Sequence, residues 1–367
     1  MKNNILSLML ILIITACTSP QLEVTQTPPP ATLEPTAITF PSATSTPEKI
    51  QMFNLISDDP IVPHGESSDW DSRYTDPGAV IYHDGMFYMF RNGFRDFPAE
   101  SQVGLVTSPD GYTWTEQGDE PIFKTSDVAY AKIAMYASSA LVMEDGSWVI
   151  YFYTWDSSSF PGSSVIGRAT ASSPAGPWVA DPEPVLNLGA MGEWDAQQVL
   201  APHVIQTTTG YVMYYSGANT SGAQKIGMAT STNGVQWTKY NDPATTEAPY
   251  AESDPVFQPG EKGQWDAGWV HQPRVFQTAE GWVMIYRGTQ NVKGEKMALG
   301  LATSPDGIHW ARSDLNPVFT PHDIPKAAYI WYDNVLLVND TYYLFVEGDV
   351  NQSTQIYLAT TEGEITP

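Results

Sequence analysis

One carboxylate, Asp76, breaks the repeated pattern of this 367-residue chain. The chain aligns with itself on glycines that close predicted hairpins, and Asp76 then falls level with residues that lack a carboxyl group. The glycines are Gly85, Gly146, Gly210 and Gly281, and the aligned residues are Ala137, Ala201 and Gln272. A residue needed only for folding would tend to recur in every repeat. The exception predicts a reactive role for Asp76, as a base or a nucleophile.

A second carboxyl group, one that donates a proton, would complete such a site. We expect Asp195 first, and Glu347 second, in this role. Asp195 lies in a loop that leads into the third repeat, and Glu347 directly follows the apolar stretch 342–346. Burial or a neighbouring carboxylate would have to raise the pKa of the acid to keep it neutral.

Asp195 also belongs to a recurring pattern in which an aspartate follows a tryptophan. The pattern occurs as Trp70-Asp71, Trp194-Asp195 and Trp265-Asp266. Because it recurs, we favour a structural role in which the carboxylate caps backbone amides of its loop. A functional role can coexist with this one.

Four of the 17 Lys and Arg residues lie near the same predicted positions, namely Arg91, Arg95, Arg274 and Arg287. They could bind a phosphate or a carboxylate. In a chain this acidic, pairing with the surplus carboxylates is the competing explanation. The residues predicted to bind a substrate are Arg91, Trp155, Asp156, Glu193, His203, Asp266, His271, Arg274, Arg287 and Asp333.

Composition limits the partners. A net charge of −24 would repel nucleic acids and anionic lipids, so the partner should be neutral or cationic. The 12 Trp and 19 Tyr suit stacking on sugar rings, although most of them should fill the core. The six histidines lack the spacing of metal ligands, so we expect no metal and no other cofactor. A Ca²⁺ ion in a central channel stays an option that no acidic loop motif supports.

Repeats position these residues. A proline followed by two apolar residues occurs five times, and four copies follow a block such as residues 104–111 and then a tryptophan. The remaining copy stands at residue 60, before the first block. The five copies are Pro60-Ile61-Val62, Pro121-Ile122-Phe123, Pro184-Val185-Leu186, Pro255-Val256-Phe257 and Pro317-Val318-Phe319. A ring closed by its own N-terminus explains the displaced copy.

Each repeat consists of short apolar stretches separated by turn signals, and helical periodicity is absent. We therefore predict an all-β fold, a five-bladed β-propeller with four-stranded blades, over residues 51–367. The strand at residues 55–62 would complete blade five and close the ring. A linear β-solenoid is the alternative, but it would need end caps and leaves the displaced copy unexplained. In a propeller, loops that enter innermost strands meet at one mouth, where functional residues concentrate.

The stretch Tyr74–Val80, followed by Gly85–Phe90, resembles the first blade of five-bladed glycosidases, among them glycoside hydrolase families 43, 32, 68 and 130. The stretches Gly281–Gly288 and Leu301–Gly307 also resemble family 130. In family 43 and its relatives an Asp-Pro at this place carries a functional aspartate, which corresponds to Asp76. The resemblance spans the whole repeat domain and implies a glycoside hydrolase that acts on an oligo- or polysaccharide.

Glycoside hydrolysis needs two carboxyl groups about 5 to 9.5 Å apart. Family 43 enzymes take the second from a Glu on a middle blade, where this chain has Ala201-Pro202. The Asp-Pro-Arg of the second blade in family 130 is replaced by Ala137-Ser138-Ser139. Two alternatives therefore stay open, a non-catalytic carbohydrate-binding propeller and a family 130-like phosphorylase.

The N-terminus predicts export. Lys2 precedes an apolar run at residues 5–14, as in a signal peptide, and Ile14–Cys17 resembles the bacterial lipobox, whose cysteine is acylated. Residues 1–16 would be a lipoprotein signal peptide, and residues 17–50, which begin with the lipidated Cys17, a Pro-, Thr- and Ser-rich tether. We expect an extracytoplasmic bacterial lipoprotein, a monomer whose partner is carbohydrate and whose lipid is its one attachment to the membrane.

Overall fold

The computed structural model describes residues 52–96, 101–157, 162–291, 293, 297–363 and 365. The signal peptide, Cys17 and the tether lie outside the described residues, so they stay predictions. Over the described ranges the secondary structure contains no α-helix, and no helix there is long and apolar enough to cross a membrane. Two short 3₁₀ segments are present, η1 (Thr125–Asp127) and η2 (Pro321–Asp323).

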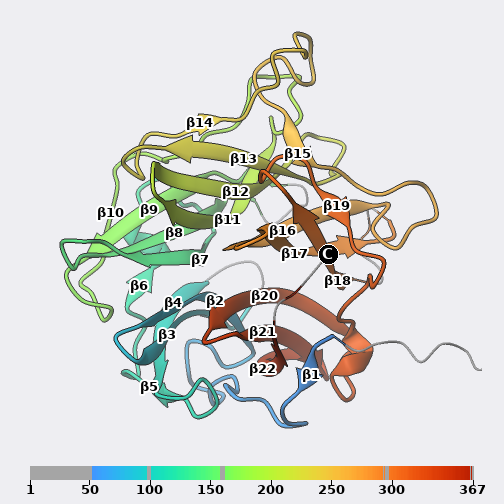
Figure 1. The fold of residues 1–367 in the computed structure, drawn as a ribbon. Helices are drawn as coiled ribbons and strands as arrows, with labels where there is room; N and C mark the ends of the chain where they lie inside the picture. The colour runs from blue at the N-terminus through green and yellow to red at the C-terminus, as the bar shows by residue number, and fades with distance from the viewer. Residues whose placement is uncertain are drawn as a thin grey trace, which may run out of the picture. The chain divides into compact units, whose positions relative to one another are not determined.

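Five antiparallel sheets surround a central axis as the blades of a propeller (Figure 1). Blade I consists of β2 (Tyr74–His83), β3 (Met86–Phe94), β4 (Gln102–Ser108) and β5 (Thr115–Glu116), with β6 (Phe123–Lys124) beside β4. Blade II consists of β7 (Ala134–Val142), β8 (Trp148–Trp155), β9 (Ile166–Ala171) and β10 (Val179–Ala180). Blade III consists of β11 (Gln198–Thr207), β12 (Gly210–Ala218), β13 (Lys225–Ser231) and β14 (Thr238–Lys239), with β15 (Pro255–Phe257) beside β13.

Blades IV and V complete the ring. Blade IV consists of β16 (Trp269–Thr278), β17 (Gly281–Thr289), β18 (Ala298–Ser304) and β19 (Ala311–Arg312). Blade V consists of β20 (Tyr329–Val338), β21 (Thr341–Val350), β22 (Ser353–Glu362) and β1 (Asn54–Leu55). The predicted all-β propeller with five four-stranded blades is confirmed.

The N-terminal segment closes the ring through two separate contacts. Strand β1 pairs with β22, where Leu55 lies opposite Ala359. Further along the chain, the Ile61 N–H donates to the Ile356 carbonyl at 2.8 Å, and Val62 forms a bridge with the same residue. The closure predicted for residues 55–62 is therefore confirmed, although a continuous strand does not span this segment.

The other Pro-apolar copies make the same contact within their own blades. In each case the last apolar residue pairs with the third strand of the blade. The pairs are Phe123 with Val103, Leu186 with Ile166, Phe257 with Ile226, and Phe319 with Leu299. The sequence repeats five times because this contact exists once in every blade.

The repeated Ser-Pro-Asp-Gly blocks form the turns between third and fourth strands. In blade I the Gly111 N–H donates to the Ser108 hydroxyl at 2.8 Å. Asp110 accepts hydrogen bonds from the N–H groups of Tyr112 and Thr113, each at 2.8 Å. The Trp114 indole N–H donates to the Gly111 carbonyl at 2.9 Å, which explains why a tryptophan follows the block. Gly111 has a φ of +80°, a conformation that favours glycine.

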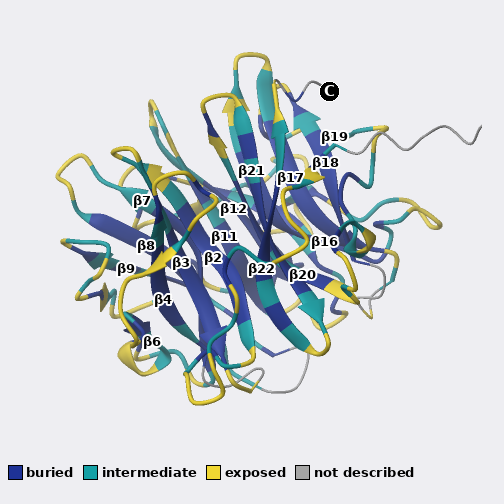
Figure 2. Ribbon diagram, turned by 90° about the horizontal axis from the view of Figure 1, so that it is seen from below, coloured by how far each residue is buried: buried dark blue, intermediate teal, exposed yellow. Residues whose placement is uncertain are grey.

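Five apolar clusters, one between each pair of neighbouring blades, form the core. The cluster between blades I and II contains Phe90 and Phe152, and the cluster between blades V and I contains Met89 and Phe345. Figure 2 shows the buried strands between exposed loops at their two ends. Because every interface has its own cluster, the ring gains cohesion from burial alone, without a disulfide.

Candidate active site

Each innermost strand carries a bulge at the level of Asp76. In β2 the pairing with β3 shifts between Asp76 and Ala79, and in β16 the pairing with β17 shifts between His271 and Arg274. Similar shifts interrupt β7, β11 and β20. A bulge bends its strand and redirects side chains, and bulges are common beside active sites.

The hairpin register corrects the alignment of the repeats. Gly85 lies inside the two-residue turn between β2 and β3, whereas Gly210 and Gly281 are the first residues after their turns. The glycine alignment is therefore wrong by one residue for blades III and IV. The residues level with Asp76 at the bulges are Ala137, Leu200, His271 and Ile330. None of these four is a carboxylate, so the exception at Asp76 holds.

Asp76 is buried, with 1% of its surface exposed. Its Oδ1 accepts hydrogen bonds from the Gly78 N–H and from Asn92 Nδ2, both at 2.8 Å. Its Oδ2 has no hydrogen-bond partner among the described residues. Burial raises the pKa of Asp76 to about 7, although the two hydrogen bonds and the charges of Arg274 and Arg287 lower it. The carboxylate is therefore poised to ionise near neutral pH.

Glu347 reaches the same place from blade V, which adjoins blade I where the ring closes. It lies in β21, is 2% exposed, and its Oε2 lacks a hydrogen-bond partner within the described part of the chain. Burial, and then the negative charge of Asp76, raise the pKa of Glu347 well above its usual range. The Thr354 hydroxyl and Arg287 act in the opposite direction. Burial and the nearby carboxylate therefore both favour the protonated form of Glu347.

Arg287, on β17, lies beside this pair. Its Nε donates to His271 Nε2 at 2.6 Å, and its guanidinium carbon lies 5.2 Å from the centre of the Tyr332 ring. Because His271 Nε2 accepts this bond, the proton of the imidazole is on Nδ1. Burial, with the charges of Arg287 and Arg274, lowers the pKa of His271 well below its usual value. Arg287 Nη1 and His271 Nδ1 have no partners in the described residues, so both donors are available.

Arg274 reaches from blade IV to the backbone of two other blades. Its Nε and Nη2 donate to the Asp333 carbonyl at 3.0 and 2.9 Å, and its Nη1 donates to the Ser138 carbonyl at 3.2 Å. His203 accepts a hydrogen bond from the Val275 N–H at 3.1 Å. Arg274 and His203 therefore tie the innermost strands to one another around the axis.

Polar atoms without partners gather around the carboxyl pair. Both carboxylate oxygens of Asp333 lack hydrogen-bond partners among the residues described, as do Asp76 Oδ2 and Glu347 Oε2. Burial raises the pKa of Asp333 to about 6, against the charges of Arg274 and Arg287. Unsatisfied buried polar atoms are costly, so their concentration at one place indicates a site for water or a polar ligand. We call Asp76, Asp333, Glu347, Arg274, Arg287 and His271 the axial cluster.

Residues 71–316 match the protein family described as the glycosyl hydrolases family 32 N-terminal domain. The chain belongs to this family. The resemblance to five-bladed glycosidases is thereby confirmed, and the protein is a glycosidase of this superfamily. No curated protein sequence matches the chain.

Solved structures share the fold of this family 32 glycosidase at low sequence identity. A putative glycoside hydrolase from Parabacteroides distasonis ATCC 8503 has a TM-score of 0.64 and 16% identity, covering 87% of this chain and 98% of that one. A structure from a study of family 130 glycoside hydrolases that target β-1,2 mannosidic linkages in Candida mannan has a TM-score of 0.63 and 18% identity, covering 83% and 93%. A thermostable family 43 glycoside hydrolase has a TM-score of 0.57 and 15% identity, covering 80% and 90%. At these identities the likeness concerns the fold.

Asp195, the first choice as acid, is not part of the axial cluster of this glycosidase. Its Oδ2 accepts hydrogen bonds from Lys239 Nζ at 2.6 Å and from the Tyr215 hydroxyl at 3.2 Å. Asp266 is bound in the same way, by Arg312 Nε at 2.7 Å and the Tyr286 hydroxyl at 2.9 Å. The structure therefore places the second choice, Glu347, beside Asp76.

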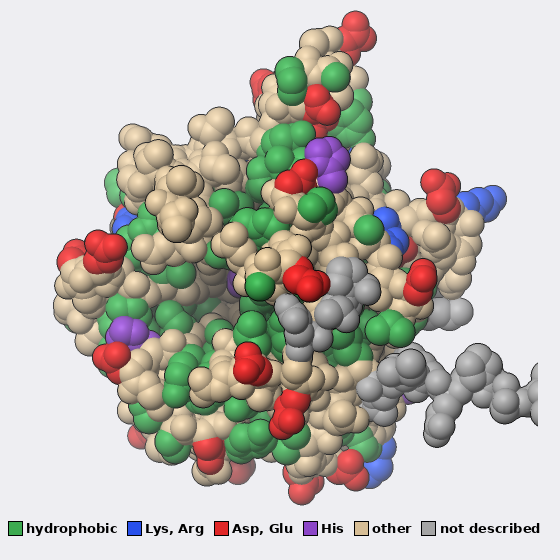
Figure 3. All heavy atoms as spheres, in the orientation of Figure 1, with side chains coloured by type: hydrophobic (Ala, Val, Ile, Leu, Met, Phe, Trp, Pro, Cys, Tyr) green, Lys and Arg blue, Asp and Glu red, His purple; other side chains and the backbone are tan. Residues whose placement is uncertain are grey.

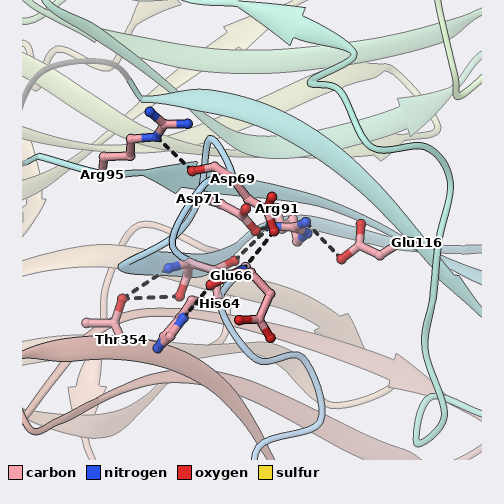
Figure 4. A network of polar contacts seen from close by, with 10 residues as sticks. His64, Glu66, Asp69, Asp71, Arg91, Arg95, Glu116 and Thr354 are labelled. Atoms are coloured by element: carbon pink, nitrogen blue, oxygen red, sulfur yellow. Dashed lines mark hydrogen bonds and ion pairs between the residues drawn. The ribbon is translucent and has the colours of Figure 1, made fainter.

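In blade I the aspartate of the Trp-Asp pair is also bound by a cation, and that cation pairs with a second carboxylate. The Asp71 carboxylate pairs with Arg91 Nη1 at 2.5 Å, and Arg91 Nη2 pairs with Glu116 at 2.8 Å (Figure 4). The Arg91 guanidinium also lies 4.9 Å from the centre of the Trp70 ring. These three Trp-Asp carboxylates each pair with a cation, which fits the structural role expected of them, although they act through ion pairs and not by capping backbone amides. The structure holds Arg91 in this network and not in the axial cluster.

The remaining predicted binding residues occupy two other places. Glu193 accepts a hydrogen bond from the Glu252 N–H at 3.3 Å, at the base of the long connection between β14 and β15. Trp155 ends β8, and Asp156 follows it, accepting a hydrogen bond from the Ser163 N–H at 2.6 Å. Trp155 and Asp156 lie at the mouth, because β8 is a second strand, and their predicted binding role stays a prediction.

Sequence reasoning missed Asn92, Tyr136, Tyr153 and Tyr332. Asn92 donates to Asp76 and also to the Ala137 carbonyl of blade II, at 3.0 Å. Tyr136 stacks on Tyr153 and Tyr332, with ring centres 5.2 and 6.0 Å apart. The hairpin register could have identified Asn92, since it faces Asp76 on β3, but the tyrosines looked like the many that fill the core. In the described ranges, no cluster of three His, Cys, Asp or Glu residues could hold a metal ion.

Proposed function

We propose that the protein hydrolyses an O-glycosidic bond of a neutral oligo- or polysaccharide, with Asp76 as base or nucleophile and Glu347 as the acid. The observation that carries this proposal is the pair of buried carboxyl groups with no cation bonded to either one. Burial raises the pKa of Asp76 to about 7, and burial together with the negative charge of Asp76 raises the pKa of Glu347 well above its usual range. Glycosidases need one ionised and one protonated carboxyl group, and this environment supports both states.

In the proposed reaction Glu347 transfers its proton to the leaving glycosidic oxygen as the bond to the anomeric carbon breaks. Asp76 either attacks that carbon or takes a proton from an attacking water molecule, and the separation of the two carboxyl groups decides which. Arg287 Nη1 and the Nδ1–H of His271 would donate hydrogen bonds to sugar oxygens, since both lack partners in the part of the chain described.

The charges of the axial cluster support hydrolysis over phosphorolysis. With Glu347 protonated, the carboxylates of Asp76 and Asp333 balance the guanidinium groups of Arg274 and Arg287. Arg274 donates hydrogen bonds to the backbone carbonyls of Asp333 and Ser138. Within the cluster, Arg287 has a guanidinium nitrogen with no partner among the described residues, which is little for a phosphate that would also face two carboxylates.

Kinetics of Asp76→Asn and Glu347→Gln on a panel of aryl glycosides would test the proposal. We expect Asp76→Asn to lower kcat/KM by about 10³-fold or more. Glu347→Gln should lose about 10²-fold on poor leaving groups and much less on an activated aryl group, which departs without a proton. Asp84→Asn in the exposed β2–β3 turn and Glu116→Gln on β5 are matched controls. Full activity of Asp76→Asn on every substrate that the wild type cleaves would contradict the proposal.

We also propose that the enzyme acts outside the cytoplasm, attached by a lipid on Cys17. The support is the sequence Ile14–Cys17, the apolar run before it, and the Pro-rich residues 17–50 that would hold the propeller away from the membrane. Metabolic labelling with a radioactive fatty acid should mark the wild type and leave Cys17→Ser unlabelled. Equal labelling of the two proteins, or a wild type that is never labelled, would refute the anchor.

A further inference from the structure

Blade III differs from the other blades in one connection. The chain between β14 and β15 runs over residues 240–254, whereas the corresponding connection in blade I covers residues 117–122 and that in blade IV residues 313–318. In Figure 1 this segment projects from the edge of the ring between the labels β14 and β15. Because the long connection occurs in one blade only, the repeated architecture does not explain it. The same reasoning singled out Asp76.

The connection is held in place by many bonds. The Asp254 carboxylate accepts the Asp242 N–H at 2.8 Å and the Thr245 hydroxyl at 2.7 Å. The Trp194 N–H donates to the Pro249 carbonyl at 2.9 Å, and the Trp194 indole donates to the Ser253 hydroxyl at 3.0 Å. Such a set of contacts fixes the position of the segment against the loop that leads into blade III.

The fixed segment forms one wall of a pocket of about 770 Å³ on the outer part of blades III and IV. Three partly exposed aromatic side chains line this pocket, namely Tyr240, Trp282 and Trp310. Asp242, Asp254 and Glu280 add carboxylate oxygens. Glu280 lies in the turn between β16 and β17, at the opposite end of the blade from the bulge. The pocket is therefore separate from the axial cluster. We call it the blade III–IV groove.

The chemistry of the groove selects a neutral hydroxylated ligand. Among the described residues that line it none is Lys or Arg and three are carboxylates, so the groove favours a neutral ligand over an anion. On the face drawn in Figure 3, acidic side chains lie among hydrophobic ones and basic side chains are few. Aromatic rings pack against the apolar C–H faces of a sugar, and carboxylates accept hydrogen bonds from its hydroxyls. The volume falls within the range of ligand sites.

The tryptophans of the groove are fixed before any ligand arrives. The Trp310 indole N–H donates to the Gly307 carbonyl at 3.0 Å, and Tyr214 packs edge-on against both Trp310 and Trp282. These contacts recur in other blades, so the tryptophans alone do not define a site. The connection at residues 240–254 does, because it adds Tyr240, Asp242 and Asp254 to the lining of the groove.

We propose that the blade III–IV groove is a second carbohydrate-binding site, which holds a neutral glycan chain away from the catalytic axis. The proposal goes beyond the proposed function and does not depend on turnover. A second site would keep a polymer attached between cleavages. The attached chain would then have a higher effective concentration at the axial cluster, which would favour the next cleavage. The ligand is a neutral polysaccharide of the kind that the axial cluster would cleave.

Binding of the protein to polysaccharides in native gels and by calorimetry tests the proposal. The probes are mannan, xylan, a β-glucan and a fructan, with polygalacturonate as an anionic control, and Asp76→Asn serves as the background so that no polymer is consumed. Tyr240→Ala should weaken binding of the preferred neutral polymer by about tenfold, the effect of roughly one lost aromatic contact. Glu280→Gln, an exposed turn residue whose replacement leaves the fold intact, should weaken it by about twofold to fivefold.

The control is Tyr112→Ala, because Tyr112 is a tyrosine of blade I that lies outside the groove, with 41% of its surface accessible. Binding by this control should equal that of the background. If no neutral polymer binds, or if Tyr240→Ala and Glu280→Gln bind as well as Tyr112→Ala, the groove proposal is overturned. Turnover of aryl glycosides by wild type and Asp76→Asn reports separately on the axial cluster, so the two proposals fail independently.

Discussion

Two sets of buried carboxylates in this propeller contrast with each other. Asp71, Asp195 and Asp266, in the loops that lead into the blades, are at most 3% exposed, and each pairs with a cation at 2.5 to 2.7 Å. Asp76, Asp333 and Glu347 around the axis are equally buried, but the described structure contains no ion pair for any of them. The first set therefore has the contacts of structural residues. In the second set, the free-energy cost of burying a carboxylate is not offset by a direct ion pair.

The contrast indicates that the ion-paired carboxylates serve stability and that the unpaired axial carboxylates serve activity. A folded protein tends to pair its buried charges, and it departs from that rule where activity needs a perturbed carboxyl group. Arg274 and Arg287 are near enough to lower the pKa of Asp76 and Asp333, yet they bond to backbone carbonyls and to His271. The axial carboxylates are thus compensated as a group and not pair by pair.

Breaking an ion pair of the first set should have the largest effect on stability. Lys239→Met would leave Asp195 buried and uncompensated, so we expect the free energy of unfolding to fall by about 3–5 kcal/mol. Chemical denaturation measures this loss. Lys124→Met is the matched control, because Lys124 pairs with Glu120 at the surface, where a salt bridge contributes about 0–1 kcal/mol. Similar losses for the two variants would remove the distinction between the sets.

Neutralising a carboxylate of the second set should have a smaller effect of opposite sign. Asp76→Asn keeps an oxygen to accept from Gly78 and Asn92 and removes a buried charge, so we expect stability to rise by roughly 1–2 kcal/mol at alkaline pH. Because the folded pKa of Asp76, about 7, lies above its usual value, the folded state binds the extra proton. That contribution is present at low pH and is lost as the pH rises through about 7.

Thermal melting across this pH range checks both the size and the sign. The difference in Tm between Asp76→Asn and the wild type should grow from about pH 4 to about pH 7, the interval between the usual pKa of the carboxyl and its pKa in the folded protein, and then level off. Asp266→Asn, which weakens an ion pair of the first set, should lower Tm throughout. A destabilised Asp76→Asn would mean that the axial carboxylate supports the fold as the other aspartates do.

The fold could be predicted from the sequence because its repeats encode local contacts. Asp110 and Gly111 close a turn within a few residues, and Ile122 and Phe123 pair with the adjacent third strand. The displaced copy at Pro60-Ile61-Val62 predicted the closure, since Ile61 and Val62 contact Ile356 as their counterparts do in the other blades. Short-range patterns of this kind can be recognised in the sequence without knowing how the blades pack.

The site was harder to predict, because its residues meet across blades and not along the chain. Asp76 was found as an exception to the repeat, but the glycine alignment did not show that His271 stands at the same level in blade IV. Asp195 ranked above Glu347 because the sequence does not reveal that Lys239 neutralises Asp195. The predicted closure made blades V and I neighbours, but it did not show that the Glu347 side chain comes close enough to Asp76 for their charges to interact.

The pH dependence of kcat/KM on a glycoside with a poor leaving group, for wild type and Glu347→Gln, tests the central claim most directly. The wild type should show two limbs, an acidic one near pH 7 as Asp76 ionises and an alkaline one at higher pH as Glu347 loses its proton. Glu347→Gln should keep the acidic limb and lose the alkaline one. An alkaline limb that persists in Glu347→Gln would show that another group supplies the proton and would contradict the assignment of the axial pair.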